Sequence, residues 1–180
     1  MLMNRDRSAL LVVDIQERLL PHIHEGEAVL DNVVWLVKVA ERLGVPAMFS
    51  EQYPKGIGPT VAVLRGLTFP ENIAEKLHFS CVAGKCLDGL AGSDRPQVVV
   101  AGTESHVCVL QTVLDLLGQG RQVFVVAEAV GSRRTSDKEL ALARMRAHGA
   151  EIVSREMVAF EWLRQAGSDE FRAISREFLR

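Results

Sequence analysis

Apolar residues in this chain alternate between short unbroken runs and longer stretches with a helical period. The runs of Val, Leu and Ile lack polar alternation, which is typical of strands covered on both faces and hence of a parallel sheet. They predict strands at Ser8–Val13, Pro46–Ser50, Leu77–Phe79, Gln97–Ala101, Gln122–Ala127 and Ala150–Val153.

The intervening stretches carry apolar residues every three or four positions, which predicts amphipathic helices. The predicted helices are Ala28–Leu43, Pro70–Glu75, Gly84–Leu90, Ser105–Leu117, Ser136–Ala147, Met157–Leu163 and Asp169–Leu179. Ser168 is a candidate N-cap, and the Pro and Gly content of Gln52–Thr60 predicts a loop. We find no repeat, low-complexity segment or linker. The pattern therefore predicts one α/β domain over residues 1–180, a three-layer α/β/α sandwich around a mostly parallel six-stranded sheet.

Composition narrows the function classes. The net charge is −2 with scattered basic residues, so nucleic acid and membrane are not expected partners. No apolar run approaches the ~18 residues of a membrane span, and the polar start at Met1–Arg7 predicts no signal peptide. Three cysteines fit a reducing cytoplasm better than a disulfide framework, and Cys81 and Cys86 lack zinc-site spacing. We expect a cytoplasmic protein without a bound metal.

Candidate chemistry lies where the predicted strands end, because ligands of open parallel sheets bind outside the carboxyl ends of strands. Asp14 follows the first strand; it is either a general base or a structural carboxylate, and the pattern leaves both readings open. Cys108 follows the strand at Gln97–Ala101. With Ser105 as N-cap, Cys108 occupies the first helical turn, where the helix dipole lowers a thiol pKa. A buried core cysteine is the alternative. His106 is a poor base for Cys108 because residues two apart do not share a helix face.

These motifs together resemble the isochorismatase-like cysteine hydrolases over nearly the whole chain. The resemblance rests on Val13–Gln16, on Lys76 before an aromatic-containing segment, and on Gly102–Cys108. The isochorismatase-domain-containing subgroup is most similar, through Ser50–Gly56, Phe79–Cys81 and Glu104–Thr112.

The resemblance implies roles for particular residues. Cys108 would attack a small amide, carbamoyl or related C–N substrate to give a thioester, Asp14 would act as base, and Lys76 would hold both in place. It also implies a cis peptide bond between Thr103 and Glu104. That bond would turn the Glu104 N–H toward the Cys108 N–H to form an oxyanion hole.

The sequence also departs from better-known relatives. Glu51–Lys55 contains no histidine where metal-binding nicotinamidases carry two, so no metal or other cofactor is expected. Isochorismatases have a small residue where Cys108 stands, so isochorismate is not the expected substrate.

The substrate pocket is expected at Gln16, Tyr53, His78 and Ser105. Two other functions stay open. One is a thiol redox sensor in which Cys81 resolves oxidised Cys108. The other is a non-catalytic interaction protein that uses apolar residues of the two C-terminal helices. The resemblance also implies a homo-oligomer, a dimer or larger.

Overall fold

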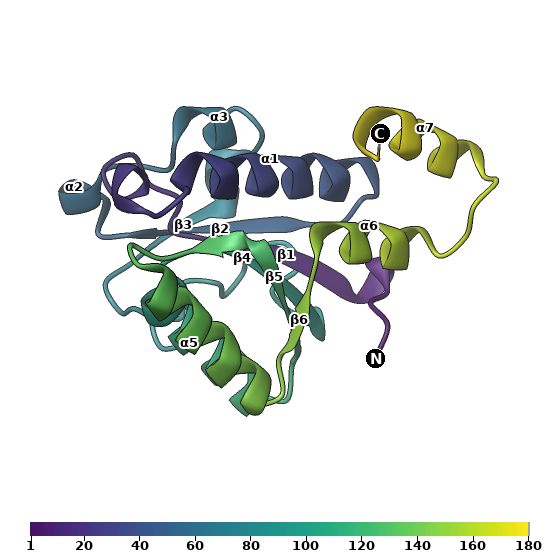
Figure 1. Cartoon of the computed structure of the whole chain (residues 1–180). Coiled ribbons are helices and arrows are strands. Elements are labelled where there is room, and N and C mark those ends of the chain that lie inside the picture. Colours follow the sequence, from purple (N-terminus) through teal and green to yellow (C-terminus); the bar gives the residue numbers. More distant parts are fainter. Residues whose placement is uncertain (180) are drawn as a thin grey trace.

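The computed structural model describes residues 1–179 and contains one six-stranded sheet (Figure 1). The strand order is β3-β2-β1-β4-β5-β6, and every neighbouring pair is parallel. The strands are β1 (Ser8–Val13), β2 (Ala47–Gln52), β3 (Ile73–Lys76), β4 (Gln97–Thr103), β5 (Gln122–Gly131) and β6 (Glu151–Val153). The predicted six-stranded, mostly parallel sheet is confirmed, and β1 lies in its interior between β2 and β4.

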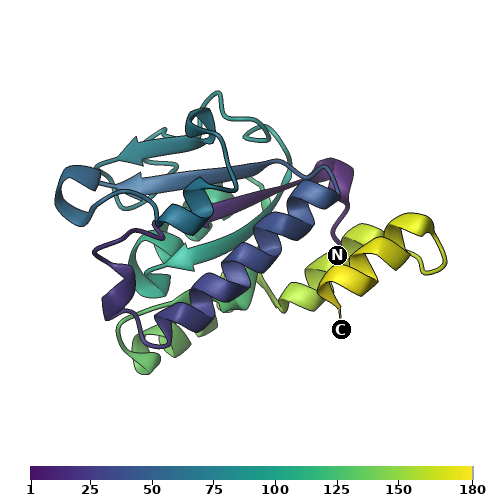
Figure 2. The same ribbon diagram turned by 90° about the horizontal axis from the view of Figure 1, so that it is seen from above.

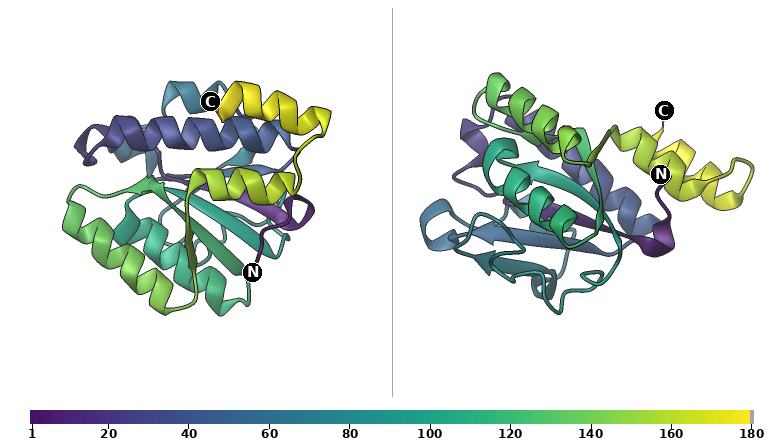
Figure 3. Two further views of the ribbon diagram at one scale, coloured as in Figure 1. Left: turned by 45° about the vertical axis from the view of Figure 1, so that its right-hand side comes forward. Right: turned by 90° about the horizontal axis from the view of Figure 1, so that it is seen from below.

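Helices cover both faces of the sheet, which confirms the predicted three-layer sandwich (Figures 1 and 3). One face carries α1 (Gly26–Arg42), α3 (Ala62–Arg65), α6 (Arg155–Leu163) and α7 (Asp169–Phe178), and the other carries α4 (Leu110–Gly118) and α5 (Thr135–Ala147). A one-turn helix, α2 (Pro54–Ile57), follows β2. Short 3₁₀ turns lie at Arg5–Arg7, Leu20–His22 and Pro70–Asn72, and a π-helical turn, Ser105–Val109, precedes α4.

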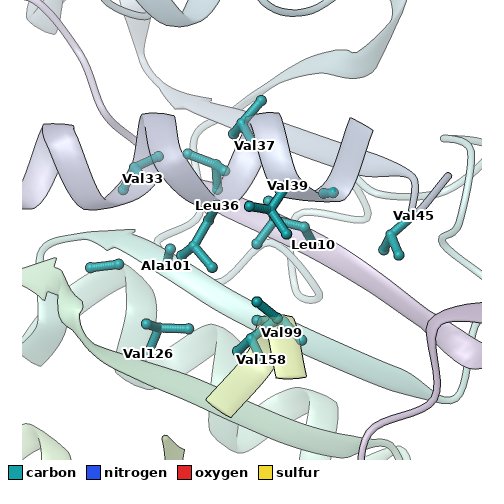
Figure 4. Packing of buried hydrophobic residues seen from close by; sticks show 14 of the residues in the cluster. Leu10, Val33, Leu36, Val37, Val39, Val45, Val99, Ala101, Val126 and Val158 are labelled. Atoms are coloured by element: carbon teal, nitrogen blue, oxygen red, sulfur yellow. The ribbon is translucent and has the colours of Figure 1, made fainter. Parts of the chain in front are cut away.

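The central strands are buried on both sides, because successive side chains of a strand point to opposite faces. Leu10 of β1 packs with Val99 of β4 beneath Val33 and Leu36 of α1 (Figure 4). The next residue, Leu11, belongs to the core on the α4 and α5 side. This two-sided burial explains the unbroken apolar runs in the sequence.

The C-terminal helices close one end of the α1 layer (Figure 2). The Ser168 side chain accepts a hydrogen bond from the Phe171 N–H at 3.0 Å, so the predicted N-cap of α7 is confirmed. The Trp35 indole N–H of α1 donates to the Phe178 carbonyl at 3.0 Å. Trp162 of α6 is buried in the same core. No helix within residues 1–179 is both long enough and apolar enough to cross a membrane.

Two predicted elements near Lys76 are wrong. The strand is Ile73–Lys76, and Leu77–Phe79 is an exposed segment outside the sheet. The helix predicted at Pro70–Glu75 is only the 3₁₀ turn at its start. Pairing with β2 decides the structure of this segment, since an open sheet edge satisfies backbone groups that a short helix leaves unpaired. Lys76 therefore lies at the carboxyl end of a strand.

The region from Gly84 to Leu90 forms turns and no helix. Lys85 has a φ of 50° and Gly89 a φ of 83°, and these left-handed conformations interrupt a right-handed helix. Gln52, predicted in a loop, is the last residue of β2.

Candidate active site

Four strand ends meet at the carboxyl edge of the sheet. Asp14 directly follows β1, Lys76 ends β3, and Cys108 lies in the π-helical turn after β4. Strand β2, between β1 and β3, contributes Ser50 and Gln52. The parallel topology thus brings together residues that are far apart in the sequence.

Asp14 and Lys76 form an ion pair with no solvent exposure of either side chain. The Lys76 Nζ lies 2.8 Å from Asp14 Oδ2, and the Ser50 hydroxyl donates to Asp14 Oδ1 at 2.7 Å. Lys76 also donates to Gln52 Oε1 at 2.7 Å. Buried charges are tolerated only when paired and hydrogen-bonded, and this pair meets both conditions. Burial is the largest single influence and favours neutral Lys76, but the charge of Asp14, the hydrogen bond to it and the nearby Cys108 together outweigh burial and raise the Lys76 pKa.

Gln52 connects the ion pair to Cys108. Its Oε1 is 3.9 Å from Cys108 Sγ, and its Nε2 donates to the Leu77 carbonyl at 2.8 Å. Neither Ser50 nor Gln52 was assigned a role from the sequence. The signal that singled out Asp14, a polar residue at the end of an apolar strand, also marks these two positions, two apart on one face of β2.

Gln16 is fully buried and holds main-chain groups. Its Nε2 donates to the carbonyls of Gln52 (2.9 Å) and Gly58 (2.7 Å), and its Oε1 accepts from the Gln52 N–H at 2.8 Å. Gln16 therefore fixes the chain after β2, although the sequence suggested it for a substrate pocket.

Cys108 lies in a widened first turn. The Glu104 carbonyl accepts from the N–H groups of Val107 (3.1 Å) and Val109 (3.2 Å). The Thr103–Glu104 peptide bond is cis, as the resemblance implied. The predicted N-cap role of Ser105 is wrong: the cap position is Glu104, and within residues 1–179 the buried Ser105 hydroxyl has no hydrogen-bond partner.

The predicted lowering of the Cys108 pKa is also wrong. Burial raises the pKa of this thiol, the Asp14 charge raises it further, and the Lys76 charge opposes both. The cysteine is 6% exposed, so loss of hydration outweighs the helix-end effect that the sequence suggested. The resting side chain is a neutral thiol beside a buried carboxylate.

His106 faces away from this site, in agreement with the expectation that it is a poor base. Its Nδ1 lies 2.9 Å from the Ser132 hydroxyl, and its Nε2 lies 3.9 Å from Asp137 of α5. The Glu104 carboxylate accepts from the main-chain N–H and the Nε of Arg133. These contacts fix the chain after β5 to the turn that carries Cys108.

A cavity of about 510 Å³ opens beside the ion pair. Tyr53 and His78, two of the predicted pocket residues, line it together with Pro54, Lys55, Glu75, Lys76, Leu77 and Gly84. Asp14, Cys108, Gln16 and Ser105 are not part of this wall. The Lys76 side chain is fully buried, so its main chain faces the cavity. Within residues 1–179 no three His, Cys, Asp or Glu residues form a group that could hold a metal ion.

Comparison with known proteins identifies the family. Residues 8–157 match the family model described as the Isochorismatase domain. Isochorismatase domain-containing protein 2A of Mus musculus is 37% identical over 173 residues, which cover 95% of this chain and 82% of the mouse protein.

Two solved structures are similar over almost the whole chain. The MAR1 ribonuclease of Caenorhabditis elegans has a TM-score of 0.89 and 31% identity, covering 100% of this chain and 93% of that one. YcaC of Pseudomonas aeruginosa, solved with hexane-2,5-diol and covalent acrylamide, has a TM-score of 0.87 and 27% identity, covering 99% and 92%. On the family match and the relatives at this identity, the chain belongs to the isochorismatase domain family.

Proposed function

We propose that this protein is a cysteine hydrolase that cleaves a small amide, carbamoyl or related C–N bond, with Cys108 as nucleophile, Asp14 as base and Lys76 as the fixed cation. The observation that carries the proposal is the buried Asp14–Lys76 pair, joined through Gln52 to a neutral thiol at the same sheet edge.

The chemistry follows from the charge state of the thiol. Because the pKa of Cys108 is raised by burial and by Asp14, sulfur attacks the carbonyl carbon while Asp14 accepts the thiol proton. The N–H groups of Glu104 and Cys108 stabilise the oxyanion of the tetrahedral intermediate.

Collapse of that intermediate breaks the C–N bond, and the amine leaves with the proton held by Asp14. The thioester is then attacked by water, with Asp14 again as base, and Cys108 regains its proton as the acid departs. Lys76 stays charged throughout, in keeping with its raised pKa, and fixes the orientation of the carboxylate. No step requires a cofactor.

The cavity lined by Tyr53 and His78 is the proposed entrance for the substrate. Its volume of about 510 Å³ lies within the usual range of small-molecule sites. Small amides, ureides and carbamoyl compounds that fit this volume are therefore the first compounds to test.

The test is a screen of amides, ureides and carbamoyl compounds, read out as release of ammonia or amine. Cys108→Ala is expected to lose activity by at least about 10³-fold while keeping the wild-type circular dichroism spectrum. Cys86→Ala, outside the proposed machinery, is the matched control. Trapping a substrate thioester on Cys108 by mass spectrometry supports the mechanism, and retained turnover in Cys108→Ala refutes it.

RNA belongs in the same screen, because one similar structure bears the name ribonuclease. The net charge of −2 supports a small-molecule substrate over a polyanion. The proposal expects no RNA cleavage. Cleavage that disappears in Cys108→Ala would replace the proposed substrate class.

We also propose a cytoplasmic homo-oligomer of at least two copies. Phe69 and Leu77, which flank the segment of β3 and are 69% and 74% exposed, are the residues to test as contacts between copies. Light scattering on the purified chain tests the oligomeric state, and a monomer at micromolar concentration contradicts the proposed oligomer.

A further inference from the structure

Cys81 and Cys86 stand at the two ends of a tight turn behind the candidate active site. The Cys86 N–H donates to the Cys81 carbonyl at 3.2 Å, and the Lys85 N–H donates to the Val82 carbonyl at 2.9 Å. Lys85, the residue just before Cys86 in this turn, has a left-handed φ of 50°. These nested bonds around a left-handed residue define a Schellman motif.

In a Schellman motif the side chains of the first and sixth residues pack against each other. Here both are cysteines, so the backbone itself brings two thiols together. A disulfide needs Cα atoms about 4.4–6.8 Å apart, and the main-chain hydrogen bond between Cys86 and Cys81 keeps the two backbones close enough for us to infer that this link can form.

The two thiols differ in environment. Cys81 is fully buried, and its N–H donates to the Thr112 hydroxyl at 3.0 Å. A hydrogen bond from Cys86 lowers the pKa of Cys81, although burial opposes this, and the same contact raises the pKa of Cys86. Of the two thiols, Cys81 is therefore the one that loses its proton first, and Cys86 keeps its own.

A second cavity lies against Cys81. It has a volume of about 240 Å³, and its wall includes Cys81, Leu87, Leu116 and Arg121. It is lined by different residues from the cavity at Tyr53 and His78. A peroxide can thus reach the cavity wall that contains Cys81 without passing through the proposed substrate entrance; Cys81 itself is 0% exposed at rest, so its sulfur reacts when that wall opens.

We propose that Cys81 and Cys86 are a reversible oxidation site that a small peroxide converts to an intramolecular disulfide. The Cys81 thiol loses its proton, its thiolate attacks one peroxide oxygen and the O–O bond breaks, so that Cys81 becomes a sulfenic acid; the other oxygen leaves as alkoxide or hydroxide and takes up a proton equivalent to the one that Cys81 lost, which gives alcohol or water. The Cys86 sulfur then attacks the Cys81 sulfur, and the hydroxyl departs with the Cys86 proton as water. Two thiols are oxidised and one peroxide is reduced.

This pairing differs from the Cys81–Cys108 link that the sequence suggested for a redox sensor. It requires no participation of Cys108, whose sulfur is directed to Gln52. The proposal is also independent of hydrolysis, so each can fail without the other.

The experiment treats the full-length protein with hydrogen peroxide, blocks free thiols with iodoacetamide and maps peptides without reduction. Trypsin combined with a protease that cuts before aspartate separates the three cysteines into residues 77–85, 86–87 and 94–114. The expected product joins 77–85 to 86–87 and is removed by dithiothreitol.

Two variants make the result specific. Cys86→Ser is expected to reduce the linked product to background, and Cys108→Ala is expected to form it at the wild-type rate. A link between 77–85 and 94–114, or three thiols still open to alkylation after peroxide, overturns the proposal. Formation of the disulfide in a Cys108→Ala protein keeps this result separate from any test of hydrolysis.

Discussion

The carboxyl ends of β1 to β3 and the turn after β4 differ in how completely their buried polar side chains are hydrogen-bonded. On the first side, Asp14, Ser50 and Lys76 are buried and every charged group has close partners, at 2.7–2.8 Å. On the second, Thr103 and Glu104 are hydrogen-bonded, but the buried Ser105 hydroxyl has no partner within residues 1–179, and the Cys108 sulfur has a long contact of 3.9 Å with Gln52.

This difference distinguishes the residues that hold the site in one geometry from the residue that reacts. A fully bonded buried network has one geometry and resists change. A thiol with one long contact keeps the freedom to change partners. Under the proposed function, the first side fixes the base and its cation, and the second side presents the group that forms a bond with substrate.

The largest effect is expected from Lys76→Met. This change leaves the Asp14 carboxylate buried without its cation, which is expected to lower the free energy of unfolding by about 3–5 kcal/mol. Urea denaturation measures it, with Lys38→Met at an exposed site of α1 as the control, expected within about 0.5 kcal/mol of wild type. The double variant Asp14→Asn/Lys76→Met should recover part of the loss. A loss below about 1 kcal/mol in Lys76→Met contradicts the ion-pair account.

Gly102→Ala is expected to disrupt the junction between the two sides. Gly102 has a φ of 122°, and a Cβ there would lie 2.0 Å from the Val13 carbonyl oxygen, so β1 and β4 must separate. Backbone strain and overpacking together predict a loss of about 2–4 kcal/mol. Gly118→Ala, in open space at the end of α4, is expected to gain about 0.5–1 kcal/mol. Thermal unfolding measures both variants, and equal changes in their midpoint temperatures would contradict the predicted clash at Gly102.

Ser50→Ala and Ser105→Ala test the comparison with one chemical change at two sites. Ser50→Ala removes a hydrogen bond to the Asp14 carboxylate and is expected to cost about 1.5–3 kcal/mol. Ser105→Ala removes a buried hydroxyl without a partner and is expected to stabilise by up to about 1 kcal/mol. Guanidinium denaturation measures the change in the free energy of unfolding for each variant. A change of the same sign in both variants contradicts the difference between the two strand ends.

The smallest effect concerns the pH dependence of Cys108 alkylation. Burial and Asp14 raise the pKa of this thiol above its ordinary value of 9.0, so the thiolate forms only at higher pH than in the unfolded chain. Iodoacetamide should therefore label Cys108 several-fold more slowly in the folded protein than in urea at pH 8. Asp14→Asn removes a charge that raises the pKa and should shift the rate profile to lower pH. A folded profile at or below the urea profile contradicts the raised pKa.

Much of the fold follows from local pattern, but the element at Lys76 does not. The apolar runs and helical periods predict the layers, because two-sided burial leaves Leu10 and Leu11 equally apolar. The segment Ile73–Lys76 is half-buried at a sheet edge, so its apolar signal is weak. Its structure depends on pairing with β2, a contact that no local window contains.

The candidate site, like the fold, was predicted only in part from the sequence. The resemblance supplies Asp14, Lys76 and Cys108, and the structure brings Asp14 and Lys76 into contact. Ser50 and Gln52 are bonded to the same groups, yet the sequence gives no role to either, because their partners come from other strands. The direction of the Cys108 pKa was missed because burial and the position of Asp14 depend on the tertiary fold.

The interior position of β1 has a consequence for synthesis on the ribosome. Strand β1 emerges before β2 and β4, and β2 can pair with one of its edges soon afterwards. Its other edge waits for β4, which begins at Gln97. Until then the nascent chain exposes an apolar strand with unpaired backbone groups, a form that invites aggregation. The yield of folded protein is therefore expected to depend on how well chaperones protect this edge during translation. A truncated chain that ends before β4 exposes the same edge of β1 permanently.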